Sequence, residues 1–284
     1  MSLPSLADPS RLDAALHAMH ERGLSTDAAP YVDAARDALT PPRTPGLGGP
    51  AETPDLAPAE LAAYLDHTQL RPDATDEAID TVCAEARAHG FTTVCVPPNT
   101  VADAADGLAG TDVGVCTVVG FPHGTNRSSV KAYEATQALR DGAAEIDMVL
   151  PIGRLKSGRF ADVEADIRAV VEAVSTCTDD GCVKVILETA LLTDAETAVA
   201  CIAAQKAGAD FVKTSTGFAS AGATLPDVAL MRQMVGDALG VKAAGGVGSA
   251  DDARQMIAHG ATRIGASGSV GIVTGAVASG TYGR

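Results

Sequence analysis

The chain has no tryptophan and few other aromatic residues, only four tyrosines and five phenylalanines among 284 residues. Because 46% of the residues are hydrophobic, the core must be filled largely by Ala, Val, Ile and Leu. This composition is typical of buried parallel strands flanked by helices of small residues. It excludes disorder along the whole chain. The length lies within the range that a single α/β barrel occupies.

Positive charge is also scarce. The 21 Lys and Arg residues against 36 Asp and Glu give a formal net charge of −15. Nucleic acids are bound by cations that neutralise phosphates, so we expect no nucleic-acid partner. No apolar run is long enough to span a membrane, and the first residues lack the basic-then-apolar order of a secretory signal. We therefore expect a cytoplasmic protein without a membrane partner.

Metal-ligand spacings are missing as well. The six cysteines contain no C-x-x-C pair, and the six histidines contain no H-E-x-x-H pattern. Most cysteines lie in apolar runs such as Thr92–Val96, which favours buried free thiols. The sequence therefore predicts no metal site.

Proline is unevenly distributed along the chain. Nine of the 15 prolines lie in residues 1–58, and six of them lie between Pro41 and Pro58. A run this rich in proline cannot continue a helix and is typical of a linker. Ahead of it, the sequence predicts two short alanine-rich helices over residues 10–22 and 26–39. We expect residues 1–58 to be an N-terminal extension and residues 59–284 to be the main domain.

From residue 59 the sequence alternates between amphipathic segments and short apolar runs. Glycines that suit the left-handed end of a helix precede five of these runs; they are Gly90, Gly142, Gly208, Gly240 and Gly260. The eight expected strands cover residues 64–67, 93–96, 114–119, 146–150, 183–188, 211–214, 241–243 and 263–265. Such alternation implies parallel strands with right-handed crossovers, and eight units close into a (β/α)8 TIM barrel. A doubly wound open sheet is the alternative, although its usual G-x-G-x-x-G turn does not follow the first strand.

Three of the six lysines, Lys184, Lys213 and Lys242, lie inside predicted strands. Neighbouring barrel strands lie about 4.8 Å apart, so the amines of Lys213 and Lys242 are expected to approach each other in the lumen. Burial and a nearby like charge both favour a neutral amine, and a neutral lysine can attack a carbonyl to form a Schiff base. For any one lysine alone, snorkelling from a strand end is the alternative.

Asp147 lies between Ile146 and Met148 in another predicted strand. A carboxylate is costly to bury there unless it is paired or used. One interpretation is a structural ion pair. The other is a proton shuttle that serves carbonyl chemistry at Lys213.

Glycines and small hydroxyl residues follow the last three strands, in Thr214–Gly217, Gly245–Gly246 and Gly265–Ser269. A short helix that begins near Ser267 would point its amino terminus at the same place. Barrels often bind phosphate after strands 7 and 8 with such parts. The sequence therefore predicts a phosphorylated substrate despite the net negative charge.

Five motifs between about Leu61 and Gly275 resemble the deoxyribose-phosphate aldolase family, Schiff-base aldolases with a (β/α)8 barrel; they span residues 65–68, 119–124, 145–149, 211–218 and 241–247. The resemblance implies that Lys213 forms the Schiff base, that Lys242 perturbs it and that Asp147 relays protons. Asp66 would support Lys242. The phosphate would be held by Gly217, Gly245, Gly246, Gly265, Ser267 and Gly268.

The implied reaction is the reversible cleavage of 2-deoxy-D-ribose 5-phosphate to D-glyceraldehyde 3-phosphate and acetaldehyde, in deoxyribonucleotide catabolism. It implies a sugar-phosphate substrate, no metal or organic cofactor, and a homodimer. Three residues depart from the family pattern: Pro151 replaces a common asparagine, Gly268 a serine, and Phe218 a lysine that binds phosphate in some members. Tyr282 lies near the C-terminus, where some members place a tyrosine that assists proton transfer.

Two alternatives stay open. The departures at Pro151 and Gly268 permit another Schiff-base barrel enzyme acting on a different sugar phosphate. A non-catalytic phosphosugar-binding protein is the alternative from another class. A metal-dependent aldolase is a weaker rival.

Overall fold

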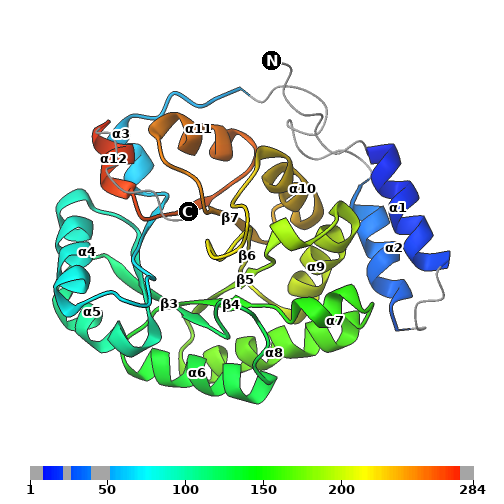
Figure 1. Ribbon diagram of the computed structural model, residues 1–284, viewed down its shortest axis with the longest axis horizontal. Coiled ribbons are helices and arrows are strands. Elements are labelled where there is room, and N and C mark those ends of the chain that lie inside the picture. The colour runs from blue at the N-terminus through cyan, green and yellow to red at the C-terminus, as the bar shows by residue number, and fades with distance from the viewer. Residues whose placement is uncertain (1–8, 22–26, 40–51, 276–284) are drawn as a thin grey trace.

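The computed structural model describes residues 9–21, 27–39 and 52–275. Within them, eight parallel strands close into a barrel in chain order (Figure 1). The strands are β1 (Leu65–Thr68), β2 (Thr93–Val96), β3 (Gly114–Val119), β4 (Glu145–Val149), β5 (Cys182–Ile186), β6 (Phe211–Lys213), β7 (Gly240–Ala244) and β8 (Arg263–Ala266). The closed barrel confirms the predicted fold class, and the open doubly wound sheet is excluded.

A ring of helices surrounds the strands (Figure 1). The helices are α3 (Pro58–Ala62), α4 (Asp76–His89), α5 (Val101–Gly107), α6 (Ser128–Arg140), α7 (Ile152–Lys156), α8 (Phe160–Cys177), α9 (Asp194–Ala207), α10 (Leu225–Val235), α11 (Ala250–Ala258) and α12 (Ser269–Thr274). On α4 the apolar stripe that includes Ile79 and Val82 is buried, as its helical spacing requires. No helix of the described ranges is long and apolar enough to cross a membrane.

The glycines that precede or begin the strands serve two different purposes. Gly90 and Gly208 end α4 and α9 in the left-handed region, with φ of 66° and 86°, as predicted. Gly240 is different, because it is the first residue of β7 and does not have positive φ. A Cβ atom at Gly240 would lie 2.1 Å from the Phe211 ring. The prediction that Gly240 ends a helix is therefore wrong; this glycine makes room for an aromatic ring.

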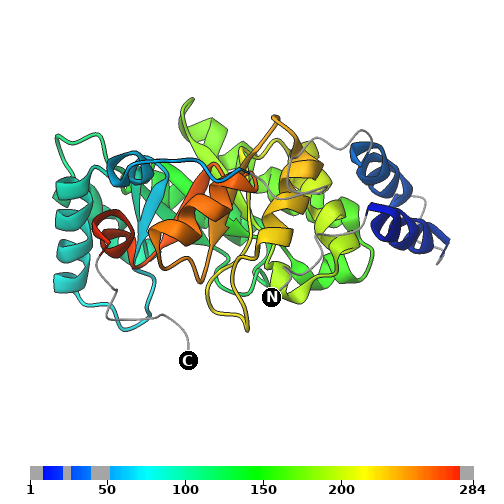
Figure 2. The ribbon, with the colours of Figure 1, turned by 90° about the horizontal axis from the view of Figure 1, so that it is seen from above.

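Two helices precede the barrel, α1 (Pro9–Glu21) and α2 (Ala29–Ala38), which confirms the two predicted helices. They pack on the outside of the barrel against α9, and α2 also contacts α10 (Figure 2). The Tyr31 hydroxyl donates a hydrogen bond of 2.6 Å to Glu164 on α8, and Gln233 on α10 donates one of 2.7 Å to the Ala38 carbonyl. The α1–α2 pair is thus docked on the barrel. Most of the predicted proline-rich linker, residues 40–51, lies outside the described residues.

The docked pair explains an unusual property of α9. Ten of its 14 residues are buried, whereas an outer helix of a barrel normally buries one stripe. The barrel covers one side of α9, and α2 covers part of the other. Leu16 and Val32 of the pair are themselves fully buried. The extension therefore shields apolar surface that α9 would otherwise expose to water.

Candidate active site

Charged side chains fill the inside of the barrel in layers. Side chains alternate between the inside and the outside of each strand, and the strand register determines which of them share a layer. One layer takes a residue from each odd-numbered strand: Asp66, Cys116, Lys184 and Lys242. The next layer toward the carboxyl ends takes one from each even-numbered strand: Cys95, Asp147, Lys213 and Gly265. The predicted lysines and aspartates thus lie in two adjoining layers.

Asp147 is the centre of this cluster. Its Oδ2 atom accepts hydrogen bonds from Lys213 at 2.6 Å and from Lys242 at 2.8 Å, and its Oδ1 atom accepts one from Lys184 at 2.7 Å. Lys213 and Lys242 are also register partners on β6 and β7. Because both amines bind one oxygen, they are near neighbours, as the sequence predicts. The snorkelling alternative is wrong for both, since they are 3% and 0% exposed.

Asp66 lies below Asp147 and supports Lys242, as predicted. Its carboxylate pairs with the Lys242 amine and also accepts a hydrogen bond of 2.7 Å from Arg263. Arg263 extends the network to Glu145, at 2.9 Å. The carboxylates and cations therefore form one continuous buried network rather than separate pairs.

The network determines the charge of its members. Burial opposes ionisation of Asp147, but the three lysines outweigh it and hold the pKa of this carboxyl well below its usual range. Burial alone would lower the pKa of Lys242, yet Asp147 and Asp66 raise it above its ordinary value. The pKa of Lys184 is raised in the same way, mainly by Asp147. At neutral pH Asp147 is therefore ionised, while Lys184 and Lys242 are cationic.

A cavity opens at the carboxyl ends of the strands and has Lys213 in its wall. Five of the predicted phosphate-binding residues line it: Gly217, Gly245, Gly246, Gly265 and Ser267. Gly268 is not among the lining residues and instead precedes α12, which has only six residues. The glycine-rich loops therefore meet beside the lysines, without the contribution expected of Gly268.

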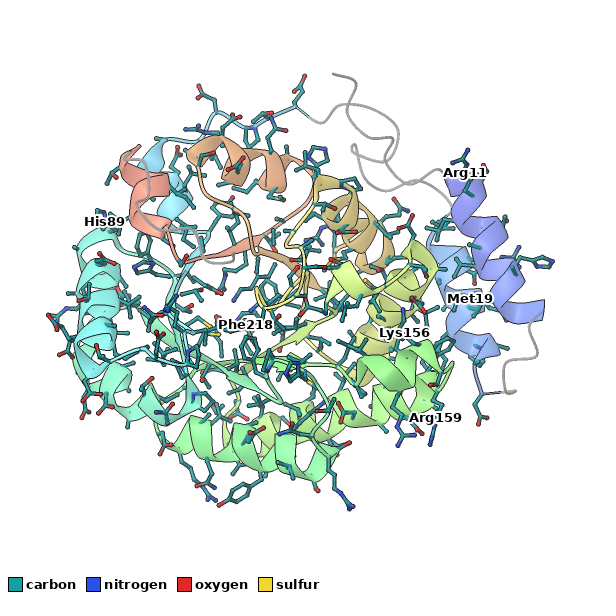
Figure 3. All side chains as sticks on the ribbon, viewed as in Figure 1. Arg11, Met19, His89, Lys156, Arg159 and Phe218 are labelled. Carbon is teal, nitrogen blue, oxygen red and sulfur yellow. The ribbon has the colours of Figure 1, made fainter. Side chains whose placement is uncertain are left out.

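An aromatic side chain occupies part of the cavity wall. Phe218 is 46% exposed, and its ring meets that of Phe121 edge to face, with centroids 5.4 Å apart. Figure 3 shows Phe218 over the middle of the ring of helices, whereas Arg11 and Met19 mark the α1–α2 pair outside it. Pro151 lines a separate hollow beside Arg127 and Arg154. Of these two departures from the family pattern, only Phe218 faces the cavity that holds Lys213.

Several members of the site were not predicted. The sequence predicts Lys184 only as a strand lysine without a role, and Glu145, Arg263 and Cys116 are not among its predicted site residues. Charged residues inside short apolar strands are the signal that could have found the first three. The expected strand 183–188 also ends early, since Glu188 has a left-handed φ of 60° and accepts a hydrogen bond of 3.3 Å from the Thr216 N–H. Tyr282 lies outside the described residues.

One group of potential metal ligands lies in the same layers. The ligand atoms of Cys95, Cys116 and Asp147 lie within 4.8 Å of one another. Asp147, however, is already bound by three lysines, whose charges oppose a further cation. The other two members of this group, Cys95 and Cys116, are free and buried thiols.

Comparison with known proteins relates the barrel to one family. The model of the DeoC/LacD family aldolases matches residues 61–277. A deoxyribose-phosphate aldolase of Streptococcus gordonii is 56% identical over 223 residues, which are 78% of this chain and 100% of the relative. An equally similar relative of the same name comes from Streptococcus pneumoniae serotype 2, with 56% identity over 223 residues.

Solved structures agree. A putative deoxyribose-phosphate aldolase from Coccidioides immitis superposes with a TM-score of 0.80 at 40% identity, over 88% of this chain and 98% of that one. A tetrameric deoxyribose phosphate aldolase from Aeropyrum pernix gives 0.70 at 32% identity, over 76% and 91%.

Proposed function

The chain belongs to the DeoC/LacD family of aldolases, and we propose how its buried network cleaves 2-deoxy-D-ribose 5-phosphate. The products are D-glyceraldehyde 3-phosphate and acetaldehyde. One observation carries the proposed mechanism: two lysine amines share one aspartate oxygen beneath a cavity lined by glycines.

The charge balance of the network favours Lys213 as the Schiff-base amine. Four cations, Lys184, Lys213, Lys242 and Arg263, face three carboxylates, Asp66, Glu145 and Asp147. Loss of one proton leaves the network neutral overall. Lys242 and Lys184 are held cationic by the carboxylates, and Lys213 is the lysine that lines the cavity. Lys213 is therefore the lysine of the network that a substrate in the cavity can reach.

The first half of the reaction forms the electron sink. The uncharged Lys213 amine attacks the C1 carbonyl of the open-chain sugar and forms a carbinolamine. Loss of water from the carbinolamine gives an iminium ion. The iminium C=N⁺ bond now lies next to the C2–C3 bond, so it can accept the electron pair of that bond when the bond breaks.

The second half breaks that bond. Asp147, ionised and hydrogen-bonded to the amine, accepts the proton of the C3 hydroxyl through a water molecule. The C2–C3 bond then breaks, its electron pair neutralises the iminium nitrogen, and glyceraldehyde 3-phosphate leaves behind the enamine of acetaldehyde. Protonation of C2 and hydrolysis release acetaldehyde and restore the Lys213 amine. Lys242, held by Asp66, keeps the surroundings of Lys213 cationic.

The phosphate would lie against the glycine-rich loops. Gly217, Gly245, Gly246, Gly265 and Ser267 supply backbone to the cavity without bulky side chains that would block it. Phe218 adds no charge to this wall, so neutral donors of the loops would carry the binding. Gly268 precedes α12 and does not line this cavity, so it is not included among the proposed phosphate-binding residues.

Turnover tests the function. Chelator-treated enzyme is given deoxyribose 5-phosphate, and glyceraldehyde 3-phosphate is detected by a coupled assay. We expect full activity without added metal. Activity that returns only with a divalent cation would favour a metal-dependent aldolase, and binding without product would favour a silent phosphosugar-binding protein. Turnover of a different sugar phosphate alone would indicate the other Schiff-base enzyme.

We also propose that residues 59–284 carry the catalysis and that residues 1–58 act as an accessory cover. In support, 223 residues of this chain match the whole of the Streptococcus gordonii relative. Leu16→Ala, at the buried face of α1, should lower the free energy of unfolding by about 2–5 kcal/mol with kcat unchanged. A fall in the kcat of Leu16→Ala under conditions in which the variant is fully folded would contradict this division of roles between residues 1–58 and 59–284.

Location and assembly are further proposals. All six cysteines are free, including the exposed Cys177, which supports a reducing compartment such as the cytoplasm. The expected homodimer stays a prediction. A molar mass from light scattering at micromolar concentration tests it, and a monomer or a tetramer would contradict it.

A further inference from the structure

Two cysteines face each other inside the catalytic barrel. Cys95 on β2 and Cys116 on β3 are register partners, and both are fully buried. Their sulfur atoms lie within 4.8 Å of each other. Together with Leu70 and Val118 they form a small apolar cluster that is separate from the main core. The pair therefore forms part of the barrel interior, next to the charged network.

Cys116 belongs to the network that holds Asp147. Its thiol donates a hydrogen bond of 3.2 Å to Asp147 Oδ1, the oxygen that also binds Lys184. Lys184 in turn donates to the Cys116 sulfur at 3.3 Å. A change in the state of this sulfur therefore reaches the carboxylate that binds Lys213.

We propose that Cys95 and Cys116 form an oxidation site, at which a hydroperoxide converts the two thiols into a disulfide and reversibly silences the aldolase. The effect on activity rests on the proposed function of Asp147 and Lys213, whereas the disulfide itself does not.

The geometry suits a disulfide. Neighbouring strands lie about 4.8 Å apart, and disulfides join residues whose Cα atoms lie about 4.4–6.8 Å apart. Leu70 lines the cavity above Lys213 and also packs in the cysteine cluster, so a small oxidant in that cavity is one side chain away from the thiols.

The two thiols are suited to different steps. The neighbouring Cys116 thiol lowers the pKa of the Cys95 thiol, and burial raises the pKa of Cys116 well above its ordinary value. The Cys95 thiolate is therefore the one that attacks the peroxide oxygen; the O–O bond breaks, an alcohol leaves with one proton, and Cys95 becomes a sulfenic acid. The Cys116 sulfur then attacks the Cys95 sulfur, the S–O bond breaks, and water leaves. In sum, two thiols are oxidised by two electrons and one hydroperoxide is reduced to an alcohol and water.

Oxidation changes the setting of Asp147. The Cys116 thiol loses its proton and no longer donates to Asp147 Oδ1, and its sulfur is drawn toward β2. Asp147 keeps its hydrogen bonds to the three lysines but loses the one from the Cys116 thiol, so its carboxylate is free to shift toward the lysines. Since small misplacements of a catalytic group are costly, we expect the oxidised enzyme to be about 100-fold slower.

The test uses the reduced full-length enzyme and tert-butyl hydroperoxide near equimolar ratio. Aldolase activity is followed, and after alkylation of free thiols the disulfide is mapped by mass spectrometry. We expect a Cys95–Cys116 crosslink that forms in step with the loss of activity, and full recovery with dithiothreitol. Cys95→Ser and Cys116→Ser, each compared with its own untreated rate, should resist the peroxide. Cys177→Ser, which removes an exposed thiol, should stay as sensitive as the unmodified chain.

Three results would overturn the proposal. They are a crosslink that involves other cysteines, a Cys95–Cys116 crosslink with undiminished activity, and serine variants that are as sensitive to the peroxide as the unmodified chain. Failure of the proposed function can be distinguished from failure of this proposal. In the first case the reduced enzyme would lack aldolase activity, while the crosslink map would still show whether Cys95 and Cys116 are oxidised.

Discussion

Asp147→Asn is the substitution that probes the buried network most strongly. The change keeps the size of the side chain but removes the negative charge that three lysines share. In the native network four cations face three carboxylates, and in the variant they face two. The asparagine amide also turns a donor toward amines that have no lone pair to offer when charged.

The size of the effect follows from burial. Removing one partner of a buried ion pair costs about 3–5 kcal/mol, because the remaining charge is left without compensation. We expect a loss of this size in the free energy of unfolding at neutral pH. The loss should shrink as the pH rises, since deprotonation of an amine relieves the excess positive charge. Loss of a general base should also lower kcat by about 100- to 10,000-fold.

The assay combines urea unfolding across pH with kcat for deoxyribose 5-phosphate. Asp166→Asn is a matched control, because Asp166 pairs with the buried Lys131 at 2.7 Å but does not line the cavity of Lys213. It should lose a similar free energy of unfolding and retain its kcat. The reasoning would be refuted by an Asp147→Asn enzyme whose free energy of unfolding lies within about 1 kcal/mol of the native value, a small part of the usual stability of a protein, and whose kcat lies within about tenfold of the native value.

Three further predictions concern the cation, the glycines and acid stability. Lys242→Leu removes the cation beside Lys213 and should lower kcat by about 100-fold; a near-native rate would remove Lys242 from the mechanism. Gly245→Ala places a Cβ 2.9 Å from the Gly222 Cα at a φ of 85°, so kcat/KM should fall more for deoxyribose 5-phosphate than for free deoxyribose. An equal fall for both sugars would reject the phosphate cradle. The lowered pKa values of Asp66 and Asp147 mean that the unfolded chain binds protons more readily, so their stabilisation is complete above about pH 4 and is lost below it. Unfolding temperatures measured from pH 7 to 3 should fall steeply for the native chain, and a flat profile would contradict this.

Much of the fold is encoded locally and could be read from the sequence. Most strands are short runs rich in apolar residues, and several helices carry an N-cap of their own, as at Thr193, whose side chain accepts from the Glu196 N–H. The exceptions depend on contacts between segments. Gly240 is small because Phe211 of the neighbouring strand needs the space, and no local pattern states that.

The site was only partly predictable for the same reason. A lysine in a strand indicates burial or function, which sufficed for Lys213 and Lys242. Which charges meet depends on the register around all eight strands, so Lys184 could not be placed beside Asp147, nor Arg263 beside Asp66. The docking of α1 and α2 could likewise not be predicted, because the proline-rich run predicts only a linker after them, although the apolar character of α9 on most sides is a sign of a cover.

The most direct test of the mechanism is to trap the covalent intermediate. The enzyme is incubated with acetaldehyde and sodium borohydride, which reduces a Schiff base to a stable N-ethyl lysine, and the modified peptide is identified by mass spectrometry. We predict modification at Lys213 and its disappearance in Lys213→Ala. An ethyl group on Lys242 or Lys184 in the native chain, or an adduct that persists in Lys213→Ala, would contradict the assignment.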